Sequence, residues 1–249
     1  MVQDFKNASH RLIVTDYDGT LVPFEHLPAE AKPPLELKET LRSLAAIPGT
    51  RVVVLSGRDK DTLQQWLGNS NATLVSEHGG WMKNPADAEW TPLVASPNDG
   101  WKKDVRPIME LFVNRIPESF IEEKTFSMVW HYRNAEEESA SSAARELLDT
   151  MTNFTTNLNI YVIPGDKIVE VRTLGINKGN FYTTQLSGGN GSAPEFILAL
   201  GDDWTDEDLF AALPEHAYSI KVGLRLSKAR FNLKSYQDVR SLFQQFVKG

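Results

Sequence analysis

The sequence predicts an α/β fold with a Rossmann-like parallel-sheet core, interrupted by an inserted α+β unit. Short apolar runs near both ends of the chain are each followed directly by polar residues, which is typical of strands buried on both faces of a parallel sheet. These runs cover residues 12–15, 52–55 and 196–200. The middle of the chain instead mixes helical and alternating patterns, which favours an α+β arrangement there.

The core elements follow in order. Between the first two strands, Leu37, Leu41 and Leu44 recur at helical spacing, and Pro33-Pro34 and Pro48-Gly49 flank this segment. A strand, a helix and a strand in this order predict a βαβ unit. Further core elements are predicted as a strand over 73–75 and helices over 35–47, 59–67, 205–213 and 238–247.

The middle of the chain alternates between the two kinds of element. Residues 126–133 alternate Phe, Met, Trp and Tyr with more polar neighbours, and Pro164-Gly165-Asp166 indicates a tight hairpin between two further strands. The elements predicted here are helices over 100–116 and 135–151 and strands over 126–133, 160–163 and 167–171. We therefore expect a core domain at 1–97 and 176–249, and an inserted domain at 98–175.

Composition narrows the class of protein. The 249 residues are 41% hydrophobic and 24% charged, which is ordinary for a folded globular chain. No apolar run approaches the roughly 20 residues that cross a membrane, and no secretory segment precedes Arg11, so a cytoplasmic protein is expected. The absence of cysteine excludes disulfides and thiolate metal sites. A formal charge of −7 argues against a nucleic-acid partner.

The segment Asp16-Tyr17-Asp18-Gly19-Thr20 directly follows the first predicted strand. Two carboxylates one residue apart at a strand end can face the same way. One can then attack a substrate as a nucleophile while the other donates and accepts protons. In isolation the segment is also compatible with a turn or with part of a calcium loop. The residues that follow, beginning with Leu21, lack the ligand spacing of an EF-hand.

Three more polar groups lie at predicted strand ends or helix starts. They are Ser56-Gly57-Arg58, Lys178-Gly179 and Gly201-Asp202-Asp203-x-x-Asp206. Each alone is compatible with a turn, an exposed lysine or a helix cap. The carboxyl ends of parallel strands meet at one edge of the sheet, however, so these groups can converge with Asp16. In an acidic chain, an anionic substrate would need such local positive charges.

In their order, the four groups resemble those of the haloacid dehalogenase-like phosphohydrolases. Additional motifs make the chain similar, nearly from end to end, to the trehalose-6-phosphate phosphatases. These motifs are Glu77-His78-Gly79, His131-Tyr132-Arg133, Gly165-x-Lys167-x-x-Glu170-x-Arg172 and Gly201-Asp202-Asp203-x-Thr205-Asp206-Glu207-Asp208-x-Phe210. The resemblance implies a haloacid dehalogenase-type core with an inserted cap domain that determines substrate specificity.

The resemblance also implies catalytic roles. Asp16 attacks phosphorus to give an aspartyl-phosphate, and Asp18 protonates the leaving sugar oxygen and then activates water. Mg²⁺ is held by Asp16, the backbone carbonyl of Asp18, and Asp202. Ser56 and Lys178 bind phosphoryl oxygens. Two further carboxylates, those of Asp203 and Asp206, either support this site or only complement the start of the following helix.

Substrate-binding residues are expected in both domains. His131 and Arg133 lie two apart on one strand, as do Glu170 and Arg172 on another, so one sheet face can present donors and acceptors to sugar hydroxyls. A surface ladder of ion pairs is the alternative interpretation. The resemblance implies that the substrate contacts are Thr20, Gly57, Arg58, Glu77 and His78 in the core and Lys124, His131, Arg133, Lys167 and Glu170 in the inserted domain.

The expected function is therefore Mg²⁺-dependent hydrolysis of trehalose 6-phosphate to trehalose and phosphate. The alternatives are a related phosphatase for sucrose phosphate or a glycosyl-phosphoglycerate, and a sensor of sugar phosphates that has lost catalysis. Retention of Asp16, Asp18, Lys178 and Asp202 weighs against the sensor. Association with a trehalose-phosphate synthase is a further expectation. A phosphate-release assay across sugar phosphates separates the alternatives.

Overall fold

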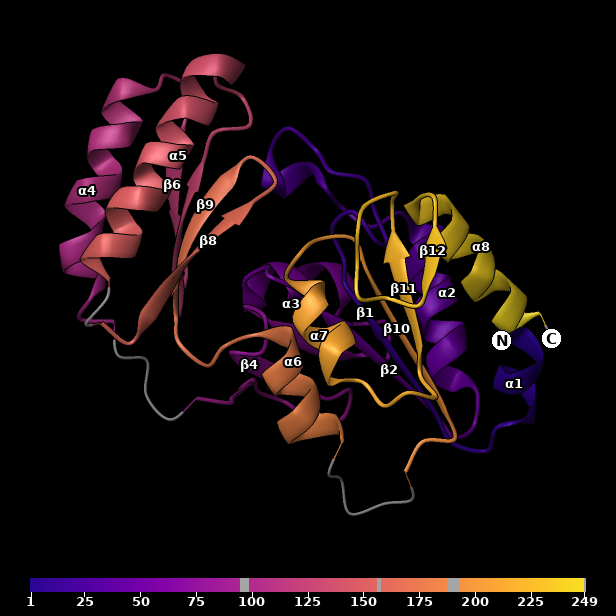
Figure 1. Cartoon of the computed structure of the whole chain (residues 1–249). Helices are drawn as coiled ribbons and strands as arrows, with labels where there is room; N and C mark the ends of the chain where they lie inside the picture. The colour runs from indigo at the N-terminus through magenta and orange to yellow at the C-terminus, as the bar shows by residue number, and fades with distance from the viewer. Residues whose placement is uncertain (95–98, 156–157, 188–192, 249) are drawn as a thin grey trace. The chain divides into compact units, whose positions relative to one another are not determined.

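The computed structural model describes residues 1–94, 99–155, 158–187 and 193–248 (Figure 1). The chain divides into two compact units, Met1–Leu93 with Asn177–Gly249, and Val94–Ile176. We call these the core unit and the inserted unit. The expected domain boundary at residues 97 and 98 lies outside the described residues, and the other expected boundary lies within one residue of the observed one.

The core unit is built on one mixed sheet. Within the described residues, its strand order is β12-β11-β10-β1-β2-β3-β4-β5, with all neighbours parallel except those that involve β4 and β5. The predicted parallel-sheet α/β class is thereby confirmed. The strands are β1 (Arg11–Thr15), β2 (Thr50–Leu55), β3 (Thr73–Ser76), β4 (Trp81–Lys83), β5 (Thr91–Pro92), β10 (Phe196–Gly201), β11 (Tyr218–Val222) and β12 (Phe231–Leu233).

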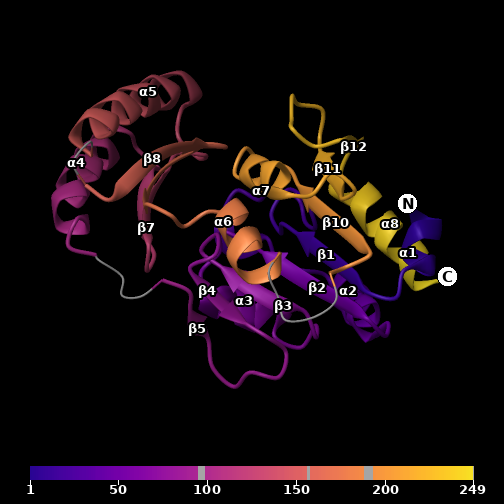
Figure 2. The ribbon, with the colours of Figure 1, turned by 60° about the horizontal axis from the view of Figure 1, so that its bottom comes forward.

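Helices cover both faces of this sheet (Figure 2). One face packs against α1 (Val2–Asn7), α2 (Leu35–Ala46), α3 (Lys60–Leu67) and α8 (Tyr236–Val247). The other packs against α6 (Lys178–Phe181), a following π-helical turn η2 (Tyr182–Leu186) and α7 (Asp206–Ala212). A short 3-10 turn η1 (Pro28–Glu30) follows β1. Apolar side chains therefore alternate between two cores along β1 and β10, which explains their continuous apolar runs.

The inserted unit has an antiparallel sheet of order β6-β7-β9-β8 among its described residues. Its elements are α4 (Lys102–Arg115), β6 (Phe120–Glu123), β7 (Ser127–His131), α5 (Glu137–Phe154), β8 (Ile160–Gly165) and β9 (Ile168–Thr173). One sheet face, with Met128, Trp130 and Val171, packs against α4 and α5. The opposite face carries His131 and Glu170, because side chains alternate along each strand.

The sequence pattern missed several short strands, which are β4, β5, β6, β11 and β12. These strands lack a long apolar run, and tertiary packing rather than intrinsic propensity determines them. The predicted hairpin is present, with a two-residue connection formed by Asp166 and Lys167. Among the described residues, no helix is both long enough and apolar enough to span a bilayer.

Candidate active site

Asp16 occupies the first position after β1, at the carboxyl edge of the core sheet. Its backbone N–H donates to the carbonyl of Leu200 on β10, so the sheet ladder continues through this residue. The side chain of Asp16 is buried, at 7% exposure. Because β1 lies between β10 and β2, its end is the place where segments from both neighbouring strands meet.

A buried lysine joins two of the predicted carboxylates. Lys178 Nζ lies 2.9 Å from Asp16 Oδ1 and 2.7 Å from Asp206 Oδ1, and Lys178 and Asp206 are at most 1% exposed. Lys178 is the first residue of α6, where the side chain of Asn177 caps the helix by accepting from the N–H of Asn180. The three charged groups come from distant parts of the sequence.

Carboxylate oxygens of Asp16, Asp202 and Asp206 all lie within 4.8 Å of one another. This donor set contains only hard oxygen atoms, which suits Mg²⁺ rather than a softer ion. The arrangement fits the expected ligands Asp16 and Asp202, and it brings Asp206 to the same place. Asp206 therefore does more than complement the start of α7.

The electrostatics of this cluster favour a bound cation. Burial, together with the neighbouring carboxylates, raises the pKa of Asp16 to about 7, although Lys178 opposes the shift. For the same reasons the pKa of Asp202 lies well above its ordinary value. Burial opposes the charged form of Lys178, but Asp16 and Asp206 raise its pKa above the ordinary value for lysine. The cluster thus carries more carboxylate than one ammonium can balance.

Asp18 forms an ion pair with Arg58. The guanidinium donates from Nε and Nη2 to the two carboxylate oxygens of Asp18, at 2.8 and 2.6 Å, and from Nη1 to the carbonyl of Pro28. Such a bidentate pair fixes the direction of the carboxylate. Arg58, which the resemblance assigns to substrate, orients the expected acid/base residue in this structure.

A strained turn supports the segment 56–58. Glu77 and His78 have φ values of 47° and 58°, which non-glycine residues seldom adopt. Their N–H groups donate to the carbonyls of Arg58 and Ser56, respectively. The hydroxyl of the fully buried Ser56 accepts from the N–H of Arg58. The two predicted substrate-binding segments of the core are therefore joined through their backbones.

Three glycines at the site leave room for functional side chains. A Cβ atom on Gly19 would lie 2.2 Å from Asp202 Oδ2, and one on Gly57 would lie 2.4 Å from His78 Nε2. A Cβ atom on Gly201 would lie 2.0 Å from the carboxyl carbon of Asp206. Thr20 donates to Asp202 Oδ1 at 3.2 Å, so in this structure it supports the carboxylate.

In the inserted unit, Glu122 gathers two of the predicted sugar-binding residues. Its Oε2 atom lies 2.8 Å from His131 Nε2 and 3.4 Å from Lys124 Nζ, and the ring of Phe120 stacks on His131. Burial opposes ionisation of Glu122, but Lys124 and His131 lower its pKa to about 2. The sequence analysis missed Glu122 because it lies on the unpredicted strand β6; the charged string Glu122-Glu123-Lys124 is the signal that could have indicated it.

The other predicted sugar-binding residues form separate pairs. Arg133 contacts Asp166, and Lys167 contacts Glu137 at the start of α5. The carboxylate of Glu170 accepts hydrogen bonds from Nε and Nη2 of Arg172, at 3.1 and 2.5 Å, and both residues are buried. Because β7 ends at His131 and Lys167 lies in the hairpin turn, Arg133 and Lys167 are beyond the strands, contrary to expectation, and their ion pairs lie at turns. The buried Glu170–Arg172 pair lies within β9 and is not an exposed surface ladder.

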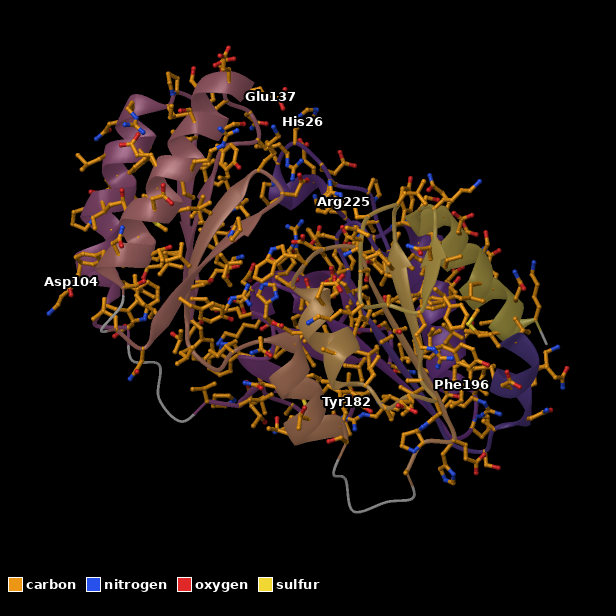
Figure 3. All side chains as sticks on the ribbon, viewed as in Figure 1. His26, Asp104, Glu137, Tyr182, Phe196 and Arg225 are labelled. Atoms are coloured by element: carbon orange, nitrogen blue, oxygen red, sulfur yellow. The ribbon has the colours of Figure 1, made fainter. Side chains whose placement is uncertain are left out.

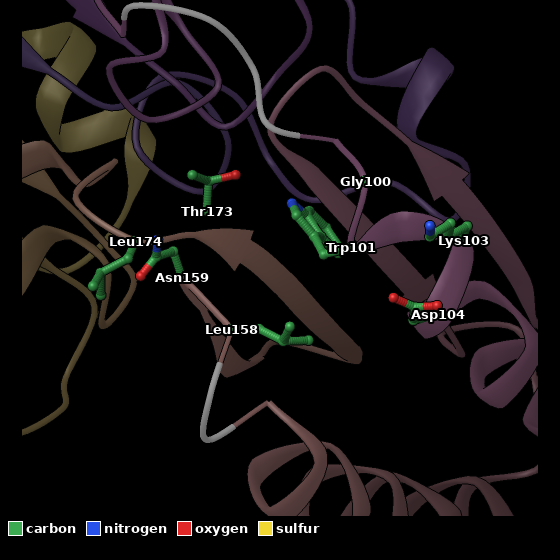
Figure 4. A pocket seen from close by; sticks show the side chains of 8 residues that line it. All are labelled: Gly100, Trp101, Lys103, Asp104, Leu158, Asn159, Thr173 and Leu174. Carbon is green, nitrogen blue, oxygen red and sulfur yellow. The ribbon is translucent and has the colours of Figure 1, made fainter.

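A separate hollow of about 510 Å³ lies at the start of α4 in the inserted unit (Figure 4). Trp101, Asn159 and Leu174 are among the residues that line it. None of the predicted catalytic or sugar-binding residues lines this hollow, so it is not part of the candidate active site.

The core sheet with its inserted antiparallel unit has the fold of the haloacid dehalogenase-like hydrolases. The fold is similar to that of a haloacid dehalogenase-like hydrolase from Bacteroides thetaiotaomicron, with a TM-score of 0.66 at 15% identity over 95% of this chain and 99% of that one. A sequence model of the trehalose-phosphatase family matches residues 14–240, and the chain belongs to that family. The resemblance drawn from the motifs is thereby confirmed.

Two similar proteins refine this placement. The chain is 41% identical over 242 residues to a bifunctional trehalose-6-phosphate synthase/phosphatase of Thermoproteus tenax, which covers 97% of this chain but 32% of that protein. The C-terminal domain of trehalose-6-phosphate phosphatase from C. albicans is 29% identical, with a TM-score of 0.94 over 99% of this chain and 95% of that one. The chain thus spans about a third of the length of the first of these relatives.

Proposed function

We propose that this protein is a Mg²⁺-dependent phosphatase that hydrolyses trehalose 6-phosphate to trehalose and phosphate. The observation that carries the proposal is the convergence of Asp16, Lys178, Asp202 and Asp206 at one edge of the sheet. Membership of the trehalose-phosphatase family supports the choice of substrate.

In the first step, an Asp16 oxygen attacks phosphorus, the bond between phosphorus and the sugar oxygen breaks, and an aspartyl-phosphate forms. Asp18 donates a proton to the departing sugar oxygen. Asp18 then takes a proton from a water molecule, whose oxygen attacks the phosphorus, so that phosphate leaves and the Asp16 carboxylate is restored. Lys178 orients Asp16 throughout and offsets charge on the phosphoryl oxygens, which Ser56 also contacts.

Asp16, Asp202 and the backbone carbonyl of Asp18 would hold Mg²⁺, with Asp206 close enough to serve as a further ligand or to orient the others. When bound, the ion would neutralise the phosphoryl oxygens and the carboxylates that face them. Burial of Asp16 and Asp202 favours their protonated forms, so ion binding and loss of protons should be coupled.

The inserted unit acts in this proposal as a cap that recognises the disaccharide. The cluster of Glu122, Lys124 and His131 supports this role, because it offers charged donors and acceptors on the sheet face that α4 and α5 do not cover. Arg133, Lys167 and Glu170 are further candidates for contact with sugar hydroxyls, as are Glu77 and His78 in the core unit.

The test is phosphate release from trehalose 6-phosphate with and without Mg²⁺. Sucrose 6-phosphate and a glucosyl-phosphoglycerate serve as competing substrates. The proposal expects trehalose 6-phosphate to give the highest kcat/KM and chelation of Mg²⁺ to abolish turnover. A higher kcat/KM for either competitor would identify that compound as the substrate instead. Binding of trehalose 6-phosphate without turnover would identify a sensor.

Association with a trehalose-phosphate synthase is the corresponding proposal for the partner. The Thermoproteus tenax relative, whose name includes both activities and of which this chain matches 32%, supports it. The cytoplasm is the compartment that this proposal assigns, because a charged sugar phosphate does not cross membranes unaided and is hydrolysed where it is made. Cofractionation of the two activities in a native extract tests the association.

A further inference from the structure

Lys221 provides a second buried ammonium group next to the acidic turn that follows β10. It lies on β11 and is 3% exposed. A lysine buried to this extent needs strong partners, because removing the ammonium from water costs several kcal/mol unless it is paired. The identity of its partners therefore indicates its role.

Strand register places Lys221 beside the turn. Lys221 pairs with Gly201, the last residue of β10, in the parallel ladder. Register partners point to the same face, and Ala199, two residues before Gly201, packs in the core beneath α7. The space that a side chain on Gly201 would fill is occupied by the carboxyl group of Asp206, so Lys221, on the neighbouring strand, lies beside the acidic segment. Figure 3 shows the edge concerned: Arg225, beyond the end of β11, lies at the opposite end of the sheet from Phe196, at the start of β10.

Lys221 holds two parts of the acidic segment at once. Its Nζ atom donates to the backbone carbonyl of Asp203 at 2.9 Å and to Glu207 Oε1 at 3.1 Å. The other carboxylate oxygen of Glu207 accepts from the backbone N–H of Lys228 at 2.6 Å. Glu207 thus links α7 both to β11 and to the segment that follows it.

The two buried lysines hold different groups of the same short segment. Lys178 holds the side chain of Asp206, whereas Lys221 holds the carbonyl of Asp203 and the side chain of Glu207. The N–H of Asp203 also donates to Asp206 Oδ2 at 3.0 Å. The segment that follows Asp202 is therefore held through backbone and side-chain groups by both lysines, and Lys178 also contacts Asp16.

We propose that Lys221 and Glu207 form a positioning pair that fixes the turn carrying Asp202 and Asp203 for binding of a divalent cation. The inference rests on the proposed function for the identity of the cation. The pair acts through the Asp203 carbonyl, to which Lys221 donates. Groups that orient metal ligands in this way commonly change metal affinity by about 10- to 100-fold when they are removed.

The test is a calorimetric titration of Mg²⁺ into the metal-free full chain and its variants. Lys221→Met keeps the length of the apolar stem and removes the ammonium, and it should weaken Mg²⁺ binding at least about tenfold. Glu207→Gln keeps the shape of the side chain and should shift affinity in the same direction. If circular dichroism shows that Lys221→Met does not fold, the Mg²⁺ affinity of Glu207→Gln still tests the proposal.

The matched control is Arg11→Met at the amino end of β1. Arg11 also holds backbone carbonyls, those of Phe5 and Pro48, in the same unit but at the edge away from the site. It should lower thermal stability without changing Mg²⁺ affinity. For Lys221→Met, the Mg²⁺ concentration that gives half-maximal hydrolysis should rise, while KM for the sugar phosphate at saturating Mg²⁺ should stay near the wild-type value.

Two outcomes separate the inference from the proposed function. Wild-type Mg²⁺ affinity in both folded variants, or an equal loss in Arg11→Met, would overturn the positioning pair and leave the phosphatase assignment intact. Mg²⁺ binding by the wild-type chain without hydrolysis of trehalose 6-phosphate would overturn the phosphatase assignment. In that case the same titration still decides whether Lys221 and Glu207 position the cation site.

Discussion

Asp16 combines two properties that are difficult to reconcile in one side chain. The proposed attack on phosphorus requires its ionised form, yet Asp16 is buried beside Asp202 and Asp206, which disfavour its charge. Lys178, 2.9 Å away, offsets part of this penalty, and a divalent cation would offset the rest. We therefore expect Asp16 to be ionised and reactive only when both Lys178 and the cation are in place.

Replacement of the proposed nucleophile should abolish turnover while leaving the fold intact. Asp16→Asn preserves size and hydrogen bonding but cannot form the acyl-phosphate, so kcat should fall at least about a thousandfold, or about 4 kcal/mol of transition-state stabilisation. Steady-state phosphate release measures the loss, and circular dichroism checks the fold. Turnover within tenfold of wild type would remove Asp16 from its assigned role.

The raised pKa of Asp16 also predicts how stability depends on pH in the absence of metal. Between the ordinary aspartate pKa of about 4 and the folded value of about 7, the folded state retains a proton that the unfolded state has lost. The folded state binds more protons in this window, so the free energy of unfolding should fall as pH rises through it.

Urea unfolding of the chelator-treated protein at pH 5 and pH 7.5 measures this slope. With Mg²⁺ present, the free energy of unfolding should fall less between the two pH values, because the ion stabilises the ionised carboxylates at the higher pH. Asp16→Asn should flatten the metal-free profile, with the remaining slope due mainly to Asp202. An identical slope in wild type and Asp16→Asn would show that another group titrates.

At the level of elements, the site depends on how β10 ends. Gly201 closes the strand, and a Cβ atom there would lie 2.0 Å from the carboxyl carbon of Asp206. Gly201→Ala should therefore displace Asp206 or α7 and lower kcat/KM at least about a hundredfold, a loss of about 3 kcal/mol. The control is Gly223→Ala, where a Cβ atom meets nothing within 4 Å.

Gly223 has a φ of 95°, so alanine there should strain the backbone and cost about 1 kcal/mol of stability. Hydrolysis should remain close to wild type, which separates a steric effect at the site from general destabilisation. Equal activity losses in the two alanine variants, measured at the same temperature, would contradict the proposed role of Gly201.

The sequence predicts the elements that carry the core and the catalytic edge, because β1, β2 and β10 are buried on both faces and read as unbroken apolar runs. It does not predict β6 or β11, whose residues alternate or carry charge and are held by their neighbours in the sheet. Glu122 on β6 and Lys221 on β11 were missed for that reason. Their roles depend on cross-strand register, which the linear pattern does not contain.

The roles of individual residues within the predicted site also could not be predicted from the sequence alone. Arg58 follows a strand as expected, but its bidentate contact with Asp18 depends on the path of the chain after β1. Asp206 was compatible with a helix-start residue, and its 2.7 Å contact with Lys178 and its distance of at most 4.8 Å from the carboxylates of Asp16 and Asp202 identify it as part of the buried cluster. Residue type and order predict the chemistry, whereas packing decides which group contacts which.

For the molecule as a whole, the proposal divides labour between chemistry in the core unit and selectivity in the inserted unit. Changes to the sugar-binding cluster should then alter KM for the disaccharide phosphate without affecting the chemical step. Glu122 is the informative position, because it holds both Lys124 and His131. Glu122→Gln keeps the shape of the side chain but removes the charge that orders them.

Glu122→Gln should raise KM for trehalose 6-phosphate about tenfold, equivalent to about 1.4 kcal/mol of binding, with kcat reduced less. Hydrolysis of p-nitrophenyl phosphate, which has no sugar, should be unchanged. The matched control is Glu146→Gln, which removes another ion-paired glutamate of the inserted unit, the partner of Arg115 on the outer helices. A parallel loss with both substrates would place Glu122 in folding or chemistry, and an equal KM change in Glu146→Gln would deny the cluster any special role in recognising the sugar.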